Sequence, residues 1–120
     1  MPESRLWNAA APPEAPGQLR IVRSDRPGTV VLSLHGELDL ACNGSLAEAA
    51  IDIPPGVQLI LDLSGLSFID SSGLRTIMNL DLRSRAEEWS LSLAQPTPAV
   101  RRLLTLCAID ERIAIQDAAP

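Results

Sequence analysis

A short apolar run in the middle of the chain constrains the fold more than any other feature. Within residues 57–63, Leu59, Ile60 and Leu61 are consecutive and apolar. A strand that faces water on one side alternates polar and apolar residues, so a continuous run is typical of a central strand covered on both faces. An amphipathic helix is predicted next, over about residues 72–85. A strand followed by a helix indicates a crossover connection and parallel strand pairing.

Weaker patterns predict the elements around this strand. A hairpin is predicted from Leu19 to Leu34, a short helix over 45–51 and a loop over 64–70. Leu91 and Leu93 mark a further strand, Thr97 and Pro98 are typical of an N-cap and first helical residue, and Ile113 and Ile115 suggest a last strand. The sequence therefore predicts one α/β domain with a mixed β-sheet of four to five strands and helices packed mainly on one side.

The two ends of the chain differ in composition. Residues 1–17 are rich in Pro and Ala, and because Pro fits neither a helix interior nor a strand ladder, a flexible tail is predicted there. The folded domain is predicted over 18–117. A total of 120 residues is the usual size of one domain and is short for two.

Composition excludes several classes of function. The net charge is −5, all ten basic residues are Arg, and they form no stripe beside aromatic side chains, which argues against nucleic-acid binding. Cys42 and Cys107 fit no metal or redox spacing, so no metal or cofactor is expected and both are interpreted as reduced, partly buried thiols. With neither a signal pattern nor a long apolar run, a cytoplasmic protein without membrane insertion is predicted, and nothing in the sequence demands more than a monomer.

The segment Asp70-Ser71-Ser72-Gly73 carries the most specific chemistry. It lies between apolar residues and the start of the predicted helix, where backbone N–H groups lack partners and the helix dipole is positive. A phosphate on a serine there would be partly compensated by those donors, and it would add roughly two negative charges beside Asp70. Taken alone, the segment also fits a simpler hypothesis, in which Ser71 or Ser72 only caps the helix.

Three stretches resemble the STAS domain family, and within it the stand-alone bacterial anti-sigma factor antagonists. They are Leu34-His35-Gly36-Glu37-Leu38-Asp39, the long run from Leu59 through Asp70-Ser71-Ser72-Gly73 to Leu74, and Pro98-Ala99-Val100-Arg101-Arg102-Leu103-Leu104. The resemblance covers about residues 19–116. The central run is the most specific of the three.

The resemblance implies a function and a set of partners. Such proteins bind an anti-sigma factor that is also a serine kinase of the GHKL ATPase type, and they thereby release a sigma factor. Phosphorylation by that kinase switches them off, and a serine phosphatase reverses it. By position, Ser71 is the implied phosphoacceptor, while Asp39, Asp70, Ser72 and Gly73 are implied partner-binding residues. Gly73 is expected to keep the helix start open to the partner.

Some positions depart from the family pattern, and other functions compete. Glu87-Glu88-Trp89-Ser90 replaces a glycine-containing turn, and Gln95 stands where relatives often have Gly. An enzyme is not expected, because the only histidine, His35, lies in an apolar strand and no nucleophile elbow is present. The main alternative is a STAS subunit that binds without being phosphorylated, either in a lipid-transport ABC system or as a stress-signalling scaffold.

Overall fold

The computed structural model describes residues 19–40 and 43–120 of the chain. The tail predicted for 1–17 and the thiol of Cys42 lie outside the described residues. The elements are β1 (Leu19–Arg26), β2 (Thr29–Leu38), α2 (Asn43–Ala49), β3 (Gln58–Ile69), α3 (Ser71–Glu87), β4 (Ser90–Ala94), α4 (Pro98–Leu106), the short 3₁₀ helix η1 (Ile109–Glu111) and β5 (Ala114–Gln116).

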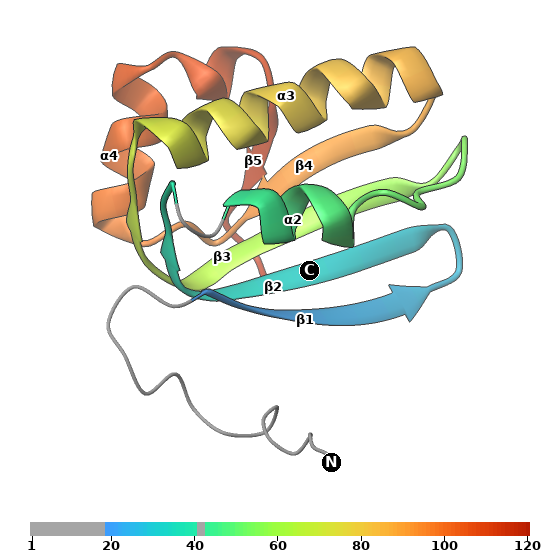
Figure 1. The fold of residues 1–120 in the computed structure, drawn as a ribbon, viewed down its shortest axis with the longest axis horizontal. Coiled ribbons are helices and arrows are strands. Elements are labelled where there is room, and N and C mark those ends of the chain that lie inside the picture. The colour runs from blue at the N-terminus through green and yellow to red at the C-terminus, as the bar shows by residue number, and fades with distance from the viewer. Residues whose placement is uncertain (1–18, 41–42) are drawn as a thin grey trace.

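The described strands form one mixed five-stranded sheet in the order β1-β2-β3-β4-β5 (Figure 1). β1 and β2 are the predicted antiparallel hairpin, whereas β2 with β3, β3 with β4 and β4 with β5 pair in parallel. Each parallel pair needs a crossover connection, and α2, α3 and α4 supply them. The predicted mixed sheet is therefore confirmed.

The core lies between one face of the sheet and the helices. Alternate strand residues such as Leu32, Leu61 and Leu93 belong to the same buried cluster as Ile77 of α3 and Leu104 of α4. On the opposite face, Val31, Ile60 and Ala94 form a small cluster of their own. Leu59, Ile60 and Leu61 are all buried, as a central strand requires, and the helices pack mainly on one side, as predicted.

The loop predicted for residues 64–70 is wrong, because β3 continues as a strand to Ile69. The pairing of β2 with β3 shifts register between Ser33 and His35 and again between Gly36 and Glu37, so the polar–apolar alternation of a regular strand is lost there. At the first shift, a Cβ on Gly65 would lie 2.3 Å from Nδ1 of His35. Glycine at position 65 therefore leaves the space that the imidazole of His35 occupies.

Other predictions are confirmed or corrected in detail. Thr97 caps α4, accepting a hydrogen bond from the Val100 amide, and Pro98 is the first helical residue, as predicted. The short helix predicted over 45–51 is present as α2, but it begins earlier than predicted, at Asn43. Cys107 is exposed rather than partly buried, because it follows the last turn of α4.

The positions where the family pattern favours glycine have a clear structural role. Glu88 ends α3 with φ of 65°, and Gln95 follows β4 with φ of 52°. Both values lie in the left-handed region, which glycine adopts without strain and other residues adopt at a cost. The amide of Gln95 donates to the carbonyl of Gln116, at 2.9 Å, and this bond fixes the backbone there.

We expect Gln95→Gly to stabilise the domain by about 0.5–1 kcal/mol, because it removes left-handed strain and keeps the amide that Gln116 needs. Urea unfolding followed by circular dichroism measures the change. Ser90→Gly, in the extended β4, is the matched control and should destabilise by a similar amount. A loss of stability in both variants would contradict the role assigned to the backbone at Gln95.

Candidate functional site at the start of helix α3

The candidate site lies where the carboxyl ends of β2 and β3 meet the start of α3. Leu38 and Ile69 are register partners at the ends of the two strands, and the amide of Asp70 donates to the carbonyl of Leu38 at 3.3 Å. Asp39 and Asp70 directly follow these paired residues. The structure therefore brings these two predicted residues, 31 positions apart in the sequence, to one edge of the sheet.

Asp70 is the N-cap of α3. Its Oδ1 accepts hydrogen bonds from the Gly73 amide at 2.9 Å and from the Ser72 hydroxyl at 2.6 Å. The hypothesis that Ser71 or Ser72 only caps the helix is therefore wrong, because the carboxylate does so. The Ser72 hydroxyl, and after it the amides of Gly73 and Leu40, hold the pKa of Asp70 below its usual value.

The two serines differ in what their hydroxyls do. Ser72 is partly buried, and its hydroxyl is bound to Asp70. Ser71, the first residue of α3, is exposed, and its side chain makes no hydrogen bond to any residue in the described ranges. An acceptor of a transferred group must be reachable by another protein's active site, and of the two serines Ser71 meets that condition better.

Gly73 has a different role from the one expected. It is buried, and a Cβ there would lie 2.6 Å from the carbonyl oxygen of Leu38 and 2.8 Å from Cγ1 of Ile69. The missing side chain lets α3 approach the ends of β2 and β3, so it serves packing inside the domain. A direct contact between Gly73 and a partner stays a prediction.

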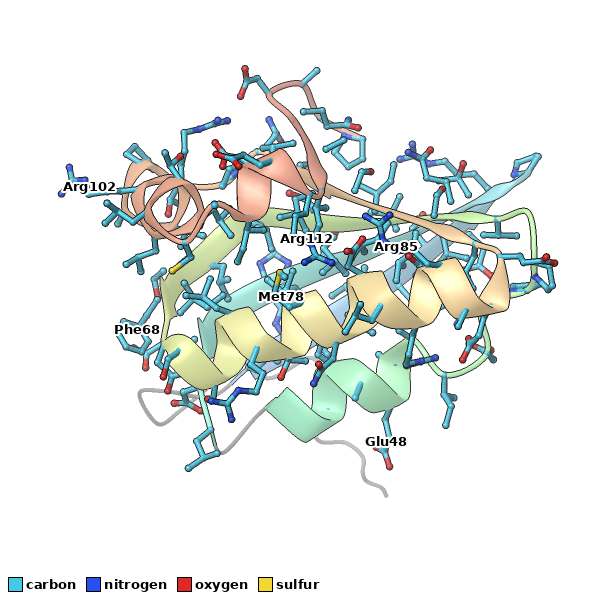
Figure 2. The ribbon with its side chains drawn as sticks, turned by 90° about the horizontal axis from the view of Figure 1, so that it is seen from above. Glu48, Phe68, Met78, Arg85, Arg102 and Arg112 are labelled. Atoms are coloured by element: carbon cyan, nitrogen blue, oxygen red, sulfur yellow. The ribbon has the colours of Figure 1, made fainter. Side chains whose placement is uncertain are left out.

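Two exposed apolar side chains flank this edge, and neither was predicted from the sequence to belong to the site. Phe68, near the end of β3, is 46% exposed, and Leu40, just beyond β2, is 76% exposed. Figure 2 shows Phe68 beside the start of α3. Exposed apolar residues around a polar centre are typical of surfaces that bind another protein.

A groove of about 300 Å³ between α2 and α3 adjoins this edge. Its lining includes Leu40, Ser72 and two arginines, Arg75 and Arg83. None of the described residues that line the groove carries a carboxylate, although the whole chain has a net charge of −5. Arg75 was not among the residues predicted from the sequence, although its spacing of four residues from Ser71 was a usable signal.

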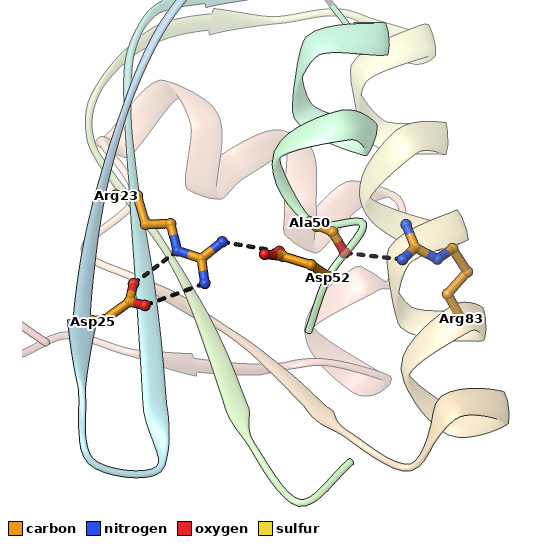
Figure 3. A network of polar contacts seen from close by, with 5 residues as sticks. All are labelled: Arg23, Asp25, Ala50, Asp52 and Arg83. Atoms are coloured by element: carbon orange, nitrogen blue, oxygen red, sulfur yellow. Dashed lines mark hydrogen bonds and ion pairs between the residues drawn. The ribbon is translucent and has the colours of Figure 1, made fainter. Parts of the chain in front are cut away.

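Polar contacts hold α2 in place beside the groove (Figure 3). Nη2 of Arg83 donates to the carbonyl of Ala50, at 2.9 Å, just after the end of α2. On the other side, Arg23 of β1 binds Asp25 and Asp52, at 2.7 and 2.9 Å. The ion pairs of Arg23 are exposed, so each contributes little stability. The pair with Asp52, together with the bond from Arg83 to Ala50, nevertheless holds the chain where it leaves α2.

The described residues contain neither a cluster of potential metal ligands nor a helix that is long and apolar enough to cross a membrane.

The chain belongs to the STAS domain family: the family model described as "Mlab, STAS domain" matches residues 21–116. This range includes every described strand and helix from β2 to β5 and all of the predicted site residues.

Comparison with individual proteins gives similar results. The chain is 34% identical over 65 residues to the anti-sigma-F factor antagonist RsfB of Mycobacterium tuberculosis, an alignment that covers 52% of this chain and 53% of RsfB. It therefore spans about half the length of that curated relative.

Solved structures match more of the chain. An anti-sigma factor antagonist from Mycobacterium paratuberculosis has a TM-score of 0.73 and 26% identity over 87% of this chain and 90% of its own. SpoIIAA in its unphosphorylated form has a TM-score of 0.60, covering 85% and 90% of the two chains, and Bacillus SpoIIAA in its phosphorylated form has 0.52, covering 82% and 90%. Both SpoIIAA matches are 23% identical, so they show the shared fold.

We expect Gly73→Ala to destabilise the domain by about 1–3 kcal/mol, because the added methyl group would collide with the carbonyl of Leu38. Thermal unfolding measures the loss. Gly44→Ala is the matched control: Gly44 lies in α2, and a Cβ there meets nothing within 4 Å. That control should be neutral or stabilising by up to about 1 kcal/mol. Equal effects of the two substitutions would contradict the packing role of Gly73.

Proposed function

We propose that this protein is an anti-sigma factor antagonist that is switched off by phosphorylation of Ser71. The observation that carries the proposal is the exposed hydroxyl of Ser71 at the first position of α3, next to a capping aspartate that engages Ser72 instead. The similarity to RsfB and to the Mycobacterium paratuberculosis antagonist supports the same function. The partner is an anti-sigma factor that is also a serine kinase of the GHKL type.

In the unphosphorylated state, the edge formed by β2, β3 and the start of α3 binds the anti-sigma factor and releases the sigma factor. Asp39, Asp70 and Ser71 supply polar contacts, and Leu40 and Phe68 supply apolar area that is already exposed. Ser72 and Gly73 complete the partner-binding segment, Ser72 by orienting Asp70 and Gly73 by allowing α3 to pack. The protein's role is to bind and be modified, and the catalytic groups belong to the kinase.

Phosphorylation changes this surface chemically. Oγ of Ser71 attacks the γ-phosphorus of ATP, a new O–P bond forms, the bridging P–O bond to ADP breaks, and the hydroxyl proton passes to a base. The product carries roughly two negative charges at the helix start. The unpaired N–H groups of the first turn favour an anion there, so the fold tolerates the phosphate. The partner loses affinity because it would have to bury that charge. A serine phosphatase removes the phosphate and restores binding.

We expect the anti-sigma factor kinase captured from the host to add one phosphate to this protein, on Ser71, in the presence of ATP and Mg²⁺. Intact-mass and fragment mass spectrometry measure the number and the position. Ser71→Ala should abolish the modification, whereas Ser72→Ala should keep it, because Ser72 orients Asp70 but does not present its hydroxyl. A phosphate on Ser72, or none with a kinase that binds, would contradict the assignment.

We expect Ser71→Asp to weaken binding to the same kinase tenfold or more, because a fixed negative charge would enter the contact surface. Isothermal titration calorimetry measures the affinity. Ser24→Asp, on the exposed part of β1, adds the same charge away from the site and should leave the affinity unchanged. Unchanged affinity for Ser71→Asp, with the fold verified by circular dichroism, would overturn the switch.

A second candidate function is a STAS subunit that binds its partner without phosphorylation, such as the small subunit of a lipid-transport ABC system or a signalling scaffold. The description of the matching family model favours keeping it, because that description names Mlab rather than an antagonist. Under this alternative, Ser71 of the protein purified from its host stays unmodified under every growth condition, and Ser71→Ala leaves partner binding intact.

A further inference from the structure

Arg75 is an exposed arginine one helical turn after Ser71. Its guanidinium forms no ion pair with any residue in the described part of the chain. In contrast, Arg83, further along the same groove, is engaged by Glu87 and by the carbonyl of Ala50. Arg75 is therefore a cation near the start of α3 whose charge nothing in the described structure compensates.

The helix directs this cation toward Ser71. Residues four apart in an α-helix lie on the same face with Cβ atoms about 6 Å apart, and long side chains lean toward the N-terminus, over the preceding turn. From its place in the groove, the Arg75 side chain can therefore reach the turn that begins with Ser71. A phosphate on Ser71 extends outward from a shorter side chain, so both groups reach the same region of the surface.

The neighbouring acidic groups do not hold Arg75. Asp70 is engaged by Ser72 and Gly73, and no ion pair joins it to any arginine in the described ranges. The other charged groups around the helix start are Asp39, after β2, and Glu37, whose register partner is Phe68. These carboxylates repel a phosphate on Ser71, and among the groups named here Arg75 alone attracts it.

We propose that Arg75 binds the phosphate once Ser71 is phosphorylated, so that the off state of the switch contains an intramolecular phosphoserine–arginine ion pair along α3. The inference rests on the proposed function, in which Ser71 is the phosphoacceptor. The ligand class is a phosphomonoester dianion, which a guanidinium can bind through two parallel hydrogen bonds.

The ion pair changes two properties of the site together. It stabilises the first turn of α3, because it adds an i,i+4 attraction to the favourable position of an anion at the helix start. It also draws the Arg75 guanidinium away from the groove between α2 and α3, where the unphosphorylated protein presents it. A partner would therefore meet a changed groove as well as a new phosphate.

The test uses protein in which phosphoserine is incorporated at position 71 during translation, so that no kinase is needed. Phosphorus NMR follows the second ionisation of the phosphate between pH 4 and 8. A nearby cation favours the dianion, so we expect Arg75→Gln to raise the phosphate pKa by about half a unit from a wild-type value below about 6. Arg75→Lys, which keeps the charge, should restore most of the wild-type value.

Arg26→Gln is the matched control, because Arg26 is exposed, forms no ion pair with a described residue, and lies in the β1–β2 hairpin at the other end of β2. It should leave the phosphate pKa unchanged. Asp39, Asp70 and Glu37 are present in every variant, so their effects cancel. Equal pKa values for the wild type, Arg75→Gln and Arg26→Gln would overturn the ion pair.

A thermal-unfolding cycle provides a second readout that distinguishes this inference from the proposed function. The phosphate should raise the unfolding temperature more in the wild type than in Arg75→Gln, and equal increments would count against the ion pair. Because the phosphate is installed without a kinase, a coupled pair combined with a kinase that leaves Ser71 unmodified would keep the inference and reject the proposed function. Modification of Ser71 without coupling would do the reverse.

Discussion

The close approach of α3 to the ends of β2 and β3 is the constraint on which the rest of the site depends. The amide of Asp70 reaches the carbonyl of Leu38, and Gly73 lies where any side chain would collide with that same carbonyl. Because Leu38 and Ile69 are register partners, the strand pairing fixes where the helix begins. A one-residue slip would turn every side chain of β3 to the other face of the sheet, so the large apolar core holds this register firmly.

This constraint also divides the work among the polar residues of the helix start. The Asp70 carboxylate accepts hydrogen bonds from the Gly73 amide and the Ser72 hydroxyl, so both the Asp70 and the Ser72 side chains take part in the local structure of the helix start. Ser71 faces outward and is not needed for the cap. A modification there changes the surface without breaking the hydrogen bonds that define the helix, and this separation makes a reversible switch compatible with a stable fold.

The fold was largely predictable because its elements have strong local signals: a continuous apolar run for β3 and Thr97-Pro98 for the start of α4. The continuation of β3 to Ile69 was not predictable, since two register shifts remove the alternation on which strand prediction depends. The cap was also misjudged, because Ser and Asp are both good N-caps and only the geometry selects Asp70. The family resemblance implied that Asp39 and Asp70 both bind the partner, and the register of β2 with β3 explains why they lie at one edge of the sheet.

In the proposed switch, local contact rather than long-range charge would let the partner distinguish the phosphorylated from the unphosphorylated protein. The chain has a net charge of −5, and a phosphate takes it to about −7, a modest change that salt screens beyond about 8 Å. A partner seated on Leu40 and Phe68, however, excludes water from the helix start, and there a dianion loses hydration that one guanidinium only partly replaces. Pairing the phosphate with Arg75 would therefore favour the free phosphorylated state and still leave a cost for the bound one. In the proposed switch, the exposed apolar rim would make phosphorylation effective, because without the rim the phosphate would stay solvated in both states.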